Sequence, residues 1–421
     1  MASRRACSRS GLVRQMSFET GSIFPGLMGF QHFTAKAARF GIPLAFAFSL
    51  AIGAEVPPEN FKIAFLGDQG LGAPSEGNLA LIKREGAQAL IHLGDFDYLN
   101  NPAAWEEQTD RLLGADFPQI AVIGNHDIGA WPGPQGYGEL VARRLQKLGV
   151  SFVGEPGLQC AFHYKGILFV LTSPGVWPGD HAGFIRKQLA ADSSLWRISA
   201  WHVNQSLMQV GTKPDEAGWE VYEESRIGGA IIATAHEHSY SRTYLLKSMI
   251  NQTVASRLGP LRLRKGRTFA FVAGLGGGEI RPQYLNGHWW ASIYTATQGA
   301  SPGALFATFH VDGDPRKAKF YFKNIHDAVI DSFTVISEVD KPNRGPFDPP
   351  PRQPRVLQWN PADWHLPKGG NLSMRDISGR TLVSTENFDQ TLTYTVQEAG
   401  IVILEVQSGN RRMQKKMVVL P

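Results

Sequence analysis

The chain of 421 residues contains two cysteines, Cys7 and Cys160. This excludes the disulfide framework that stabilises many small secreted domains. Cys160, in the segment LQCAFHY, is interpreted as a small apolar residue on a buried strand. Charged residues are also few, at 19%, whereas hydrophobic residues reach 43%. This composition excludes a disordered chain and is typical of a globular protein with a sizeable core.

Concentrated positive charge is likewise missing. The formal net charge is +5, and much of the basic excess lies close to the two ends of the chain. The middle of the sequence has no run of Lys and Arg with interleaved aromatic residues, which a nucleic-acid-binding surface would favour. We therefore expect no nucleic-acid partner.

Residues 1–54 are interpreted as a signal peptide region, with Met28 as an alternative start. Lys36 and Arg39 precede an apolar stretch over 41–52, and small residues before Glu55 suit cleavage. The apolar stretch is shorter than the about 20 residues of a membrane span. We expect a secreted or cell-surface protein without stable membrane insertion after cleavage; an uncleaved single-pass anchor is the alternative.

Five apolar runs each end in a polar cluster headed by a small residue. They are FKIAFLGDQG, ALIHLGDFDY, PQIAVIGNHD, WRISAWHVNQ and GGAIIATAHEHSY. Such runs are typical of buried strands in an α/β sheet, with functional residues on the loops at their carboxyl ends. Helices are predicted over 75–88, 137–148 and 183–190. Further strands over 268–334 are expected to complete a second sheet packed on the first.

The chain is predicted to have three parts after the signal region. Residues 60–337 form the main domain, and residues 338–355, rich in Pro, form a linker. Residues 356–421 contain short alternating runs punctuated by SGR, EAG and SGN turns. This pattern predicts a small all-β sandwich, which we call the C-terminal module.

The polar clusters of the main domain supply hard oxygen atoms and imidazoles. The candidate metal ligands are Asp68, Asp95, Tyr98, Asn125, His202, His236 and His238. Two neighbouring cations require a shared carboxylate together with neutral nitrogen and carbonyl ligands. Asp95, in a tight Gly–Asp turn, is the natural bridge. A lone histidine is more often structural, but two in HEH beside the other clusters favour ligation.

These motifs resemble those of the calcineurin-like metallophosphoesterases, and within them the purple acid phosphatase branch. The motifs are DQG at 68–70, GDFDY at 94–98, GNHD at 124–127, His202 and HEH at 236–238. The branch has Asp-x-Gly in the first motif, where the wider superfamily usually has Asp-x-His. The resemblance runs from about Phe61 to Ser337, with all five motifs in order.

The resemblance implies a β-sandwich flanked by helices (α/β/β/α) that hydrolyses small-molecule phosphate monoesters with metal-activated water. It implies that one ion is held by Asp68, Asp95, Tyr98 and His238, and the second by Asp95, Asn125, His202 and His236. It implies Fe(III) at the first site, bound by a Tyr98 phenolate, with Fe, Zn or Mn at the second. If Tyr98 is only an aromatic packed at a turn, a manganese or zinc pair is the alternative.

The resemblance also implies two catalytic residues. His126 is expected to face the phosphate and to stabilise it or protonate the leaving group, and Asp127 is expected to orient His126. Lys213 and Arg281 are candidate phosphate contacts, although Lys213 can equally be a solvated loop residue. Ala235 departs from the Gly that usually begins the last motif.

Three further possibilities are compatible with the sequence. A phosphodiesterase or nucleotide hydrolase can use the same metal site, and a metal-binding scaffold without catalysis is the alternative from another class. The C-terminal module is similar to the sorting domains of the bacterial type IX secretion system. That similarity implies secretion machinery as a partner; a generic immunoglobulin-like or fibronectin-like module is the alternative.

Overall fold

The computed structural model describes residues 55–339 continuously. Beyond them it describes six strands, over 355–359, 370–376, 381–388, 392–396, 400–408 and 411–419. The signal peptide region and most of the predicted linker lie outside the described residues. Among the described residues, no helix combines the length and apolarity required to cross a membrane.

The first sheet of the main domain has seven strands in the order β12–β17–β16–β15–β1–β2–β3. They are β1 (Phe61–Leu66), β2 (Ala89–His92), β3 (Gln119–Ala121), β12 (Leu261–Leu263), β15 (Gly303–Val311), β16 (Asp314–Asn324) and β17 (Val329–Ser337). Strands β1, β2 and β3 are parallel, whereas β15 pairs antiparallel with β1. Parallel neighbours need crossover connections. Helices α1 (Ala73–Arg84) and α2 (Pro102–Leu113) supply them.

The second sheet has eight strands in the order β14–β9–β13–β8–β7–β6–β5–β4. They are β4 (Phe152–Glu155), β5 (Gln159–Tyr164), β6 (Ile167–Leu171), β7 (Trp196–Ala200), β8 (Ile231–Thr234), β9 (Tyr240–Thr243), β13 (Ala270–Ala273) and β14 (Trp290–Tyr294). Strands β6, β7, β8 and β13 are parallel. Helices α4 (His181–Ala191) and α5 (Glu220–Gly228) connect β6 to β7 and β7 to β8.

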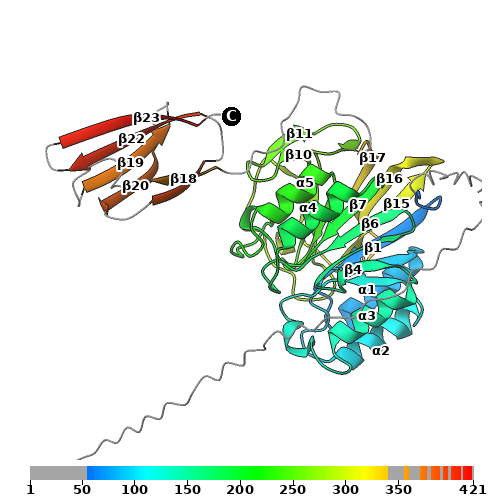
Figure 1. The fold of residues 1–421 in the computed structure, drawn as a ribbon. Coiled ribbons are helices and arrows are strands. Elements are labelled where there is room, and N and C mark those ends of the chain that lie inside the picture. Colours follow the sequence, from blue (N-terminus) through cyan, green and yellow to red (C-terminus); the bar gives the residue numbers. More distant parts are fainter. Residues whose placement is uncertain are drawn as a thin grey trace, which may run out of the picture. The chain divides into compact units, whose positions relative to one another are not determined.

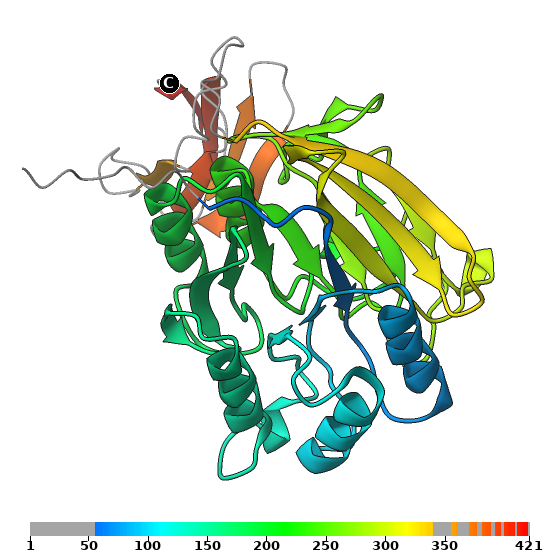
Figure 2. The same cartoon turned by 90° about the vertical axis from the view of Figure 1, so that its right-hand side faces the viewer.

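The two sheets pack face to face, and helices cover their outer faces. The central core joins both sheets; for example, the rings of Phe65 on β1 and Phe271 on β13 are 5.2 Å apart. Leu79 and Ile82 of α1 pack on the outer face of the first sheet, and α4 and α5 cover the second. Figure 1 shows α4 and α5 side by side, and Figure 2 shows α1 and α2 on the opposite side of the domain. The predicted α/β/β/α architecture is confirmed.

The predicted elements agree with the structure except where the sequence pattern is weak. The helix predicted over 75–88 is α1, at Ala73–Arg84, and those predicted over 137–148 and 183–190 are α3 (Tyr137–Lys147) and α4. All five apolar runs form strands. Helices α2 and α5 were not predicted, because their sequences, PAAWEEQTDRLL and EVYEESRIG, carry only a narrow apolar stripe.

The remaining strands form smaller sheets. In the main domain, β10 (Leu245–Ser248) and β11 (Thr253–Ser256) form a hairpin. In the C-terminal module, β18 (Arg355–Trp359) pairs with β21 (Leu392–Val396). A four-stranded antiparallel sheet has the order β20–β19–β22–β23, from β19 (Gly370–Asp376), β20 (Thr381–Phe388), β22 (Gly400–Ser408) and β23 (Arg411–Val419). The described part of this module is therefore all-β.

Candidate metal centre

The candidate ligands all follow the carboxyl ends of parallel strands. Asp68 follows β1, Asp95 and Tyr98 follow β2, Asn125 follows β3, His202 follows β7, and His236 and His238 follow β8. Parallel strands of one sheet end at one edge, which is where α/β proteins place their sites. Here the edges of both sheets meet, so residues far apart in the sequence converge.

Four of the candidate ligands have strained backbones. The φ angles are 56° at Asp68, 56° at Asp95, 60° at Tyr98 and 68° at His236. A residue with a Cβ rarely adopts this left-handed region, and such strain collects at functional sites. The fold therefore holds these side chains in positions that local preferences alone would not give them.

Glycines bring the strand ends close together. A Cβ on Gly94 would lie 2.8 Å from Nδ1 of His202, and Gly94 itself has a φ of 87°. Gly67 leaves the room that Ala235 needs, because a Cβ on Gly67 would collide with that of Ala235. The alanine at position 235, where the family usually has Gly, is therefore accommodated because its neighbour Gly67 has no side chain.

The first group of ligand atoms is formed by Asp68, Asp95 and His238. One ligand atom from each lies within 4.8 Å of the others, and all three residues are buried. The hydroxyl of Tyr98 lies 3.1 Å from Oδ1 of Asp68 and 3.0 Å from Nε2 of His238. Four potential ligand atoms from three strand ends thus lie close together.

The second group shares Asp95 with the first. Asp95, His202 and His236 also place one ligand atom each within 4.8 Å of the others. Nε2 of His202 lies 3.3 Å from Oδ1 of Asp95 and 3.2 Å from Oδ1 of Asn125. The structure thus brings together all seven residues, in the two sets that the sequence interpretation named.

Each imidazole is fixed by an acceptor outside the cluster. Nδ1 of His202 lies 2.7 Å from the Leu93 carbonyl oxygen, and Nδ1 of His238 lies 2.6 Å from that of Glu279. Nε2 of His236 lies 2.7 Å from Oε2 of Glu216. A carbonyl or carboxylate oxygen only accepts, so these nitrogens carry the hydrogen and the other ring nitrogen faces the cluster with a lone pair.

This arrangement fits metal ions. Nδ1 of His236 and Nε2 of His202 are only 3.2 Å apart, and both face the cluster. Two lone pairs repel at this distance unless a cation or a proton lies between them. The donor set, with carboxylate and amide oxygens beside imidazole nitrogens, suits divalent and trivalent transition metals.

Burial and the charges of neighbouring groups shift the pKa values of the cluster. Burial raises the pKa of Asp68 to about 7. Burial lowers the pKa of His202, but the carboxylate of Asp95 outweighs it and the pKa rises to about 9. Burial and the charges of Asp68 and Asp95 raise the pKa of Tyr98 far above its usual value. A bound metal would compete with these protons for the same lone pairs.

The structure shows that the carboxylate of Asp127 holds the backbone of neighbouring turns. Its Oδ2 accepts the main-chain N–H of Asp95 at 2.9 Å and of Gly124 at 2.7 Å, and its Oδ1 accepts that of Phe96 at 2.8 Å. Asp127 thereby joins the two turns that carry Asp95 and Asn125. The expectation that it also orients His126 stays a prediction.

His126 lies at the open side of the cluster. Its side chain is exposed, and its ring centroid is 4.9 Å from that of Tyr98. Its main-chain N–H donates to Oδ1 of Asp95 at 3.0 Å, which ties its position to the shared carboxylate. The imidazole is therefore accessible to a molecule that approaches the metal ligands.

Sequence reasoning missed two acidic residues next to the candidate ligands, Glu216 and Glu237. Glu216, in the loop after β7, contacts His236 but follows no recognisable motif. Glu237 is 1% exposed, and the hydrogen-bonding partners of its two oxygens are absent among the described residues. Its position between the two histidines of HEH was the only signal that could have pointed to it.

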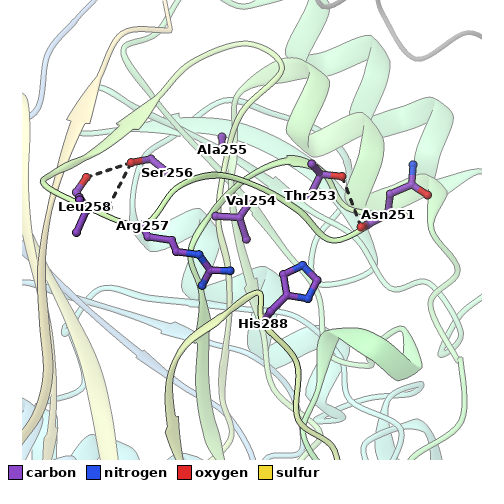
Figure 3. Close-up of a pocket in the computed structure, with 8 residues that line it drawn as sticks. All are labelled: Asn251, Thr253, Val254, Ala255, Ser256, Arg257, Leu258 and His288. Atoms are coloured by element: carbon purple, nitrogen blue, oxygen red, sulfur yellow. Dashed lines mark hydrogen bonds between the residues drawn. The ribbon is translucent and has the colours of Figure 1, made fainter.

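A surface hollow of about 590 Å³ lies at the β10–β11 hairpin, apart from the metal ligands (Figure 3). Arg257 and His288 extend toward the same space. The guanidinium of Arg257 stacks 4.7 Å from the ring of Tyr244, and Ser256 Oγ bonds to the backbone of Leu258. Because these polar groups already have partners and no carboxylate lines the hollow, we assign it no chemistry.

No family model matches the chain, and no curated protein matches it. Among solved structures, it is similar to the purple acid phosphatase PPD1 from yellow lupin (Lupinus luteus) seeds, with 15% identity and a TM-score of 0.49 over 68% of this chain. The chain spans 54% of that protein's length.

Two other solved structures are more distant. GAP50, the anchor in the inner membrane complex of Plasmodium, has 11% identity and a TM-score of 0.45, over 68% of this chain and 91% of that one. PhoD has 11% identity and a TM-score of 0.43, over 68% and 71%.

Proposed function

We propose that this chain is a metal-dependent phosphoesterase that hydrolyses phosphate monoesters. The observation that carries the proposal is the pair of ligand groups sharing Asp95, within which every imidazole is fixed by an outside acceptor. A lone structural histidine needs no such arrangement, whereas an acceptor that holds the ring nitrogen facing away from the metal is typical of metal-binding imidazoles.

The residues divide between two ions. Asp68, Tyr98 and His238 would hold one ion, Asn125, His202 and His236 the other, and Asp95 both. When bound, a metal pair lowers the pKa of water and offsets the negative charge of a phosphate group in displacement reactions. Fe(III) beside Tyr98, with Fe, Zn or Mn as the second ion, is part of the proposal.

The chain's own residues supply the rest of the chemistry. His126 is exposed beside Tyr98, so its imidazole can reach a phosphate ester at the cluster. We propose that it donates a proton to the leaving oxygen as the bond between that oxygen and phosphorus breaks. The strained turns at Asp68 and Asp95 hold the carboxylates in place before the substrate arrives.

Export is a further part of the proposal. The basic and apolar pattern of residues 1–54 supports a signal peptide, and the strand pattern of the C-terminal module supports recognition by secretion machinery. Secretion of the chain expressed with and without residues 1–54 tests this part separately from catalysis.

The experiment that tests the enzyme combines metal analysis with hydrolysis of an aryl phosphate monoester and the matching diester. We expect two metal ions per chain and faster hydrolysis of the monoester. Asp95→Asn should lose both metal and activity, whereas Asp116→Asn, at a fully exposed side chain, should keep both. Two bound metals without hydrolysis of either ester would favour a scaffold, and preference for the diester would favour a phosphodiesterase.

A further inference from the structure

Two cationic side chains reach the same metal-site histidine from different segments. Nζ of Lys213, in the loop after β7, lies 3.2 Å from Nδ1 of His236, the ring nitrogen that faces the second ligand group. Nη1 of Arg281, in the segment after β13, lies 3.5 Å from the main-chain oxygen of His236. Both charges are therefore at the border of the proposed metal centre.

The backbone around Lys213 is fixed by a buried side chain. The amide of Gln209, which is fully buried, donates to the carbonyl oxygens of Ser206 at 2.8 Å and Lys213 at 3.1 Å, and its oxygen accepts the N–H of Gly211. A loop held in this way presents its lysine with little further ordering when a ligand binds.

Arg281 is anchored by its main chain and open at its tip. Its N–H donates to the carbonyl oxygen of His238 at 3.1 Å, and its own carbonyl oxygen accepts the N–H of Ala296 at 2.9 Å. Its side chain is 35% exposed. The guanidinium is thus placed next to HEH and still accessible to a ligand from solvent.

A buried acid, Glu237, lies next to Arg281 and to the loop that carries Lys213. Oε2 of Glu237 lies 3.7 Å from Nη1 of Arg281, outside hydrogen-bonding distance. A Cβ at Gly211 would collide with the Glu237 carboxylate, so this glycine lets the Lys213 loop close over the acid. Glu237 therefore attracts the guanidinium of Arg281 across a distance that is too long for a hydrogen bond.

We propose that Lys213 and Arg281 bind the oxygens of the substrate phosphate and select phosphate monoesters over diesters. This inference rests on the proposed function. The second ionisation of a phosphate monoester has a pKa of about 6, so the monoester is largely a dianion at neutral pH, whereas a diester carries one charge. Two charge-assisted donors therefore favour the oxygen that a diester replaces with a second ester group.

The test measures binding of inorganic phosphate to the metal-loaded protein by calorimetry. Lys213→Gln and Arg281→Gln should each weaken phosphate binding about 10-fold or more, the usual effect of losing a hydrogen bond to a charged group. Lys187→Gln, at an exposed lysine of α4, removes the same charge as a matched control and should leave binding unchanged. Lys213→Arg keeps the charge and should retain more affinity than Lys213→Gln.

Metal content and ester preference complete the experiment. Both glutamine variants should keep the wild-type metal content, and both should lower the ratio of monoester to diester kcat/KM. Wild-type phosphate affinity in both variants would overturn the inference. Metal loss in Lys213→Gln would also overturn it, because the lysine would then act on His236. If the two glutamine variants show the expected loss of phosphate binding but the wild-type protein hydrolyses neither ester, only the proposed function is contradicted.

Discussion

The carboxylate of Asp127 accepts the main-chain N–H of Asp95 at 2.9 Å, and so connects the turn of the shared ligand with its own turn after β3. The same oxygen also accepts the N–H of Gly124. One buried side chain thereby fixes two of the five loops that converge on the proposed metal centre. Because it lies behind the ligands, Asp127 is a positioning residue.

Asp127→Asn is expected to destabilise the protein and to weaken both metal sites. The amide of Asn offers one acceptor oxygen where the carboxylate offers two, so a buried main-chain N–H loses its partner at a cost of about 1–3 kcal/mol. Thermal unfolding and metal titration measure the two effects. Asp116→Asn is the control, and wild-type metal affinity in Asp127→Asn would contradict the positioning role.

Glu216→Gln is expected to weaken the second metal site by about 10-fold to 100-fold, the range known for outer partners of metal-binding histidines. The neutral amide attracts the Nε2–H of His236 less strongly, so the ring becomes a poorer ligand. Competition with a chromophoric chelator measures the affinity.

Glu220→Gln, at an exposed residue in the first turn of α5, is the matched control for Glu216→Gln. It removes the same charge close by in the sequence and should leave metal affinity unchanged. Equal losses in the two variants would show that Glu216 acts through general charge and not through its contact with His236.

Acid should destabilise the protein partly through Asp192. Burial raises the pKa of Asp192, but the hydrogen bond to His163 and the charge of Arg197 outweigh it, so its pKa lies below the ordinary 3.8. A group whose pKa is lowered in the folded state stabilises the protein at pH values above its unfolded-state pKa. This stabilisation is lost as the pH falls through the folded-state pKa. Unfolding from pH 7 to pH 2 should show this loss.

Asp192→Asn provides the comparison for that pH series. Oδ1 of Asp192 lies 2.9 Å from Nε of Arg197, whose side chain is 1% exposed. Removing the carboxylate from a buried guanidinium costs about 3 kcal/mol at neutral pH. Because the variant has no carboxyl to protonate, its stability should fall less steeply below pH 4. Parallel curves for the two proteins would exclude Asp192 as a contributor.

The sequence allowed prediction of the strands and the ligands because both are local patterns. An apolar run followed by Gly–Asp, Gly–Asn–His–Asp or His–Glu–His marks a strand end and its polar loop at once. The parallel arrangement then brings these loops to one edge. The α/β/β/α layers follow from the same alternation of strands and helices.

The residues that surround and contact the candidate ligands could not be predicted in this way. Asp127 follows His126 in the sequence, yet its carboxylate points back to the turn after β2, a direction that depends on the backbone. Glu216 and Lys213 reach His236 only because the loop after β7 folds over the cluster. Such contacts join residues from separate segments, and no short motif encodes them.

Tyr98→Phe is expected to abolish a visible absorption band of the iron-loaded protein. Burial and two carboxylates hold the pKa of Tyr98 far above its usual value, so a phenolate ligand at this position favours a strongly charged cation such as Fe(III). The hydroxyl lies 3.1 Å from Asp68 and 3.0 Å from Nε2 of His238, which places it among the ligands. The wild-type spectrum should therefore contain a broad charge-transfer band. Tyr284→Phe, at a tyrosine that is 65% exposed, should leave the band unchanged. A colourless wild type that contains two manganese or zinc ions would contradict the phenolate and make phosphate diesters the next substrates to test.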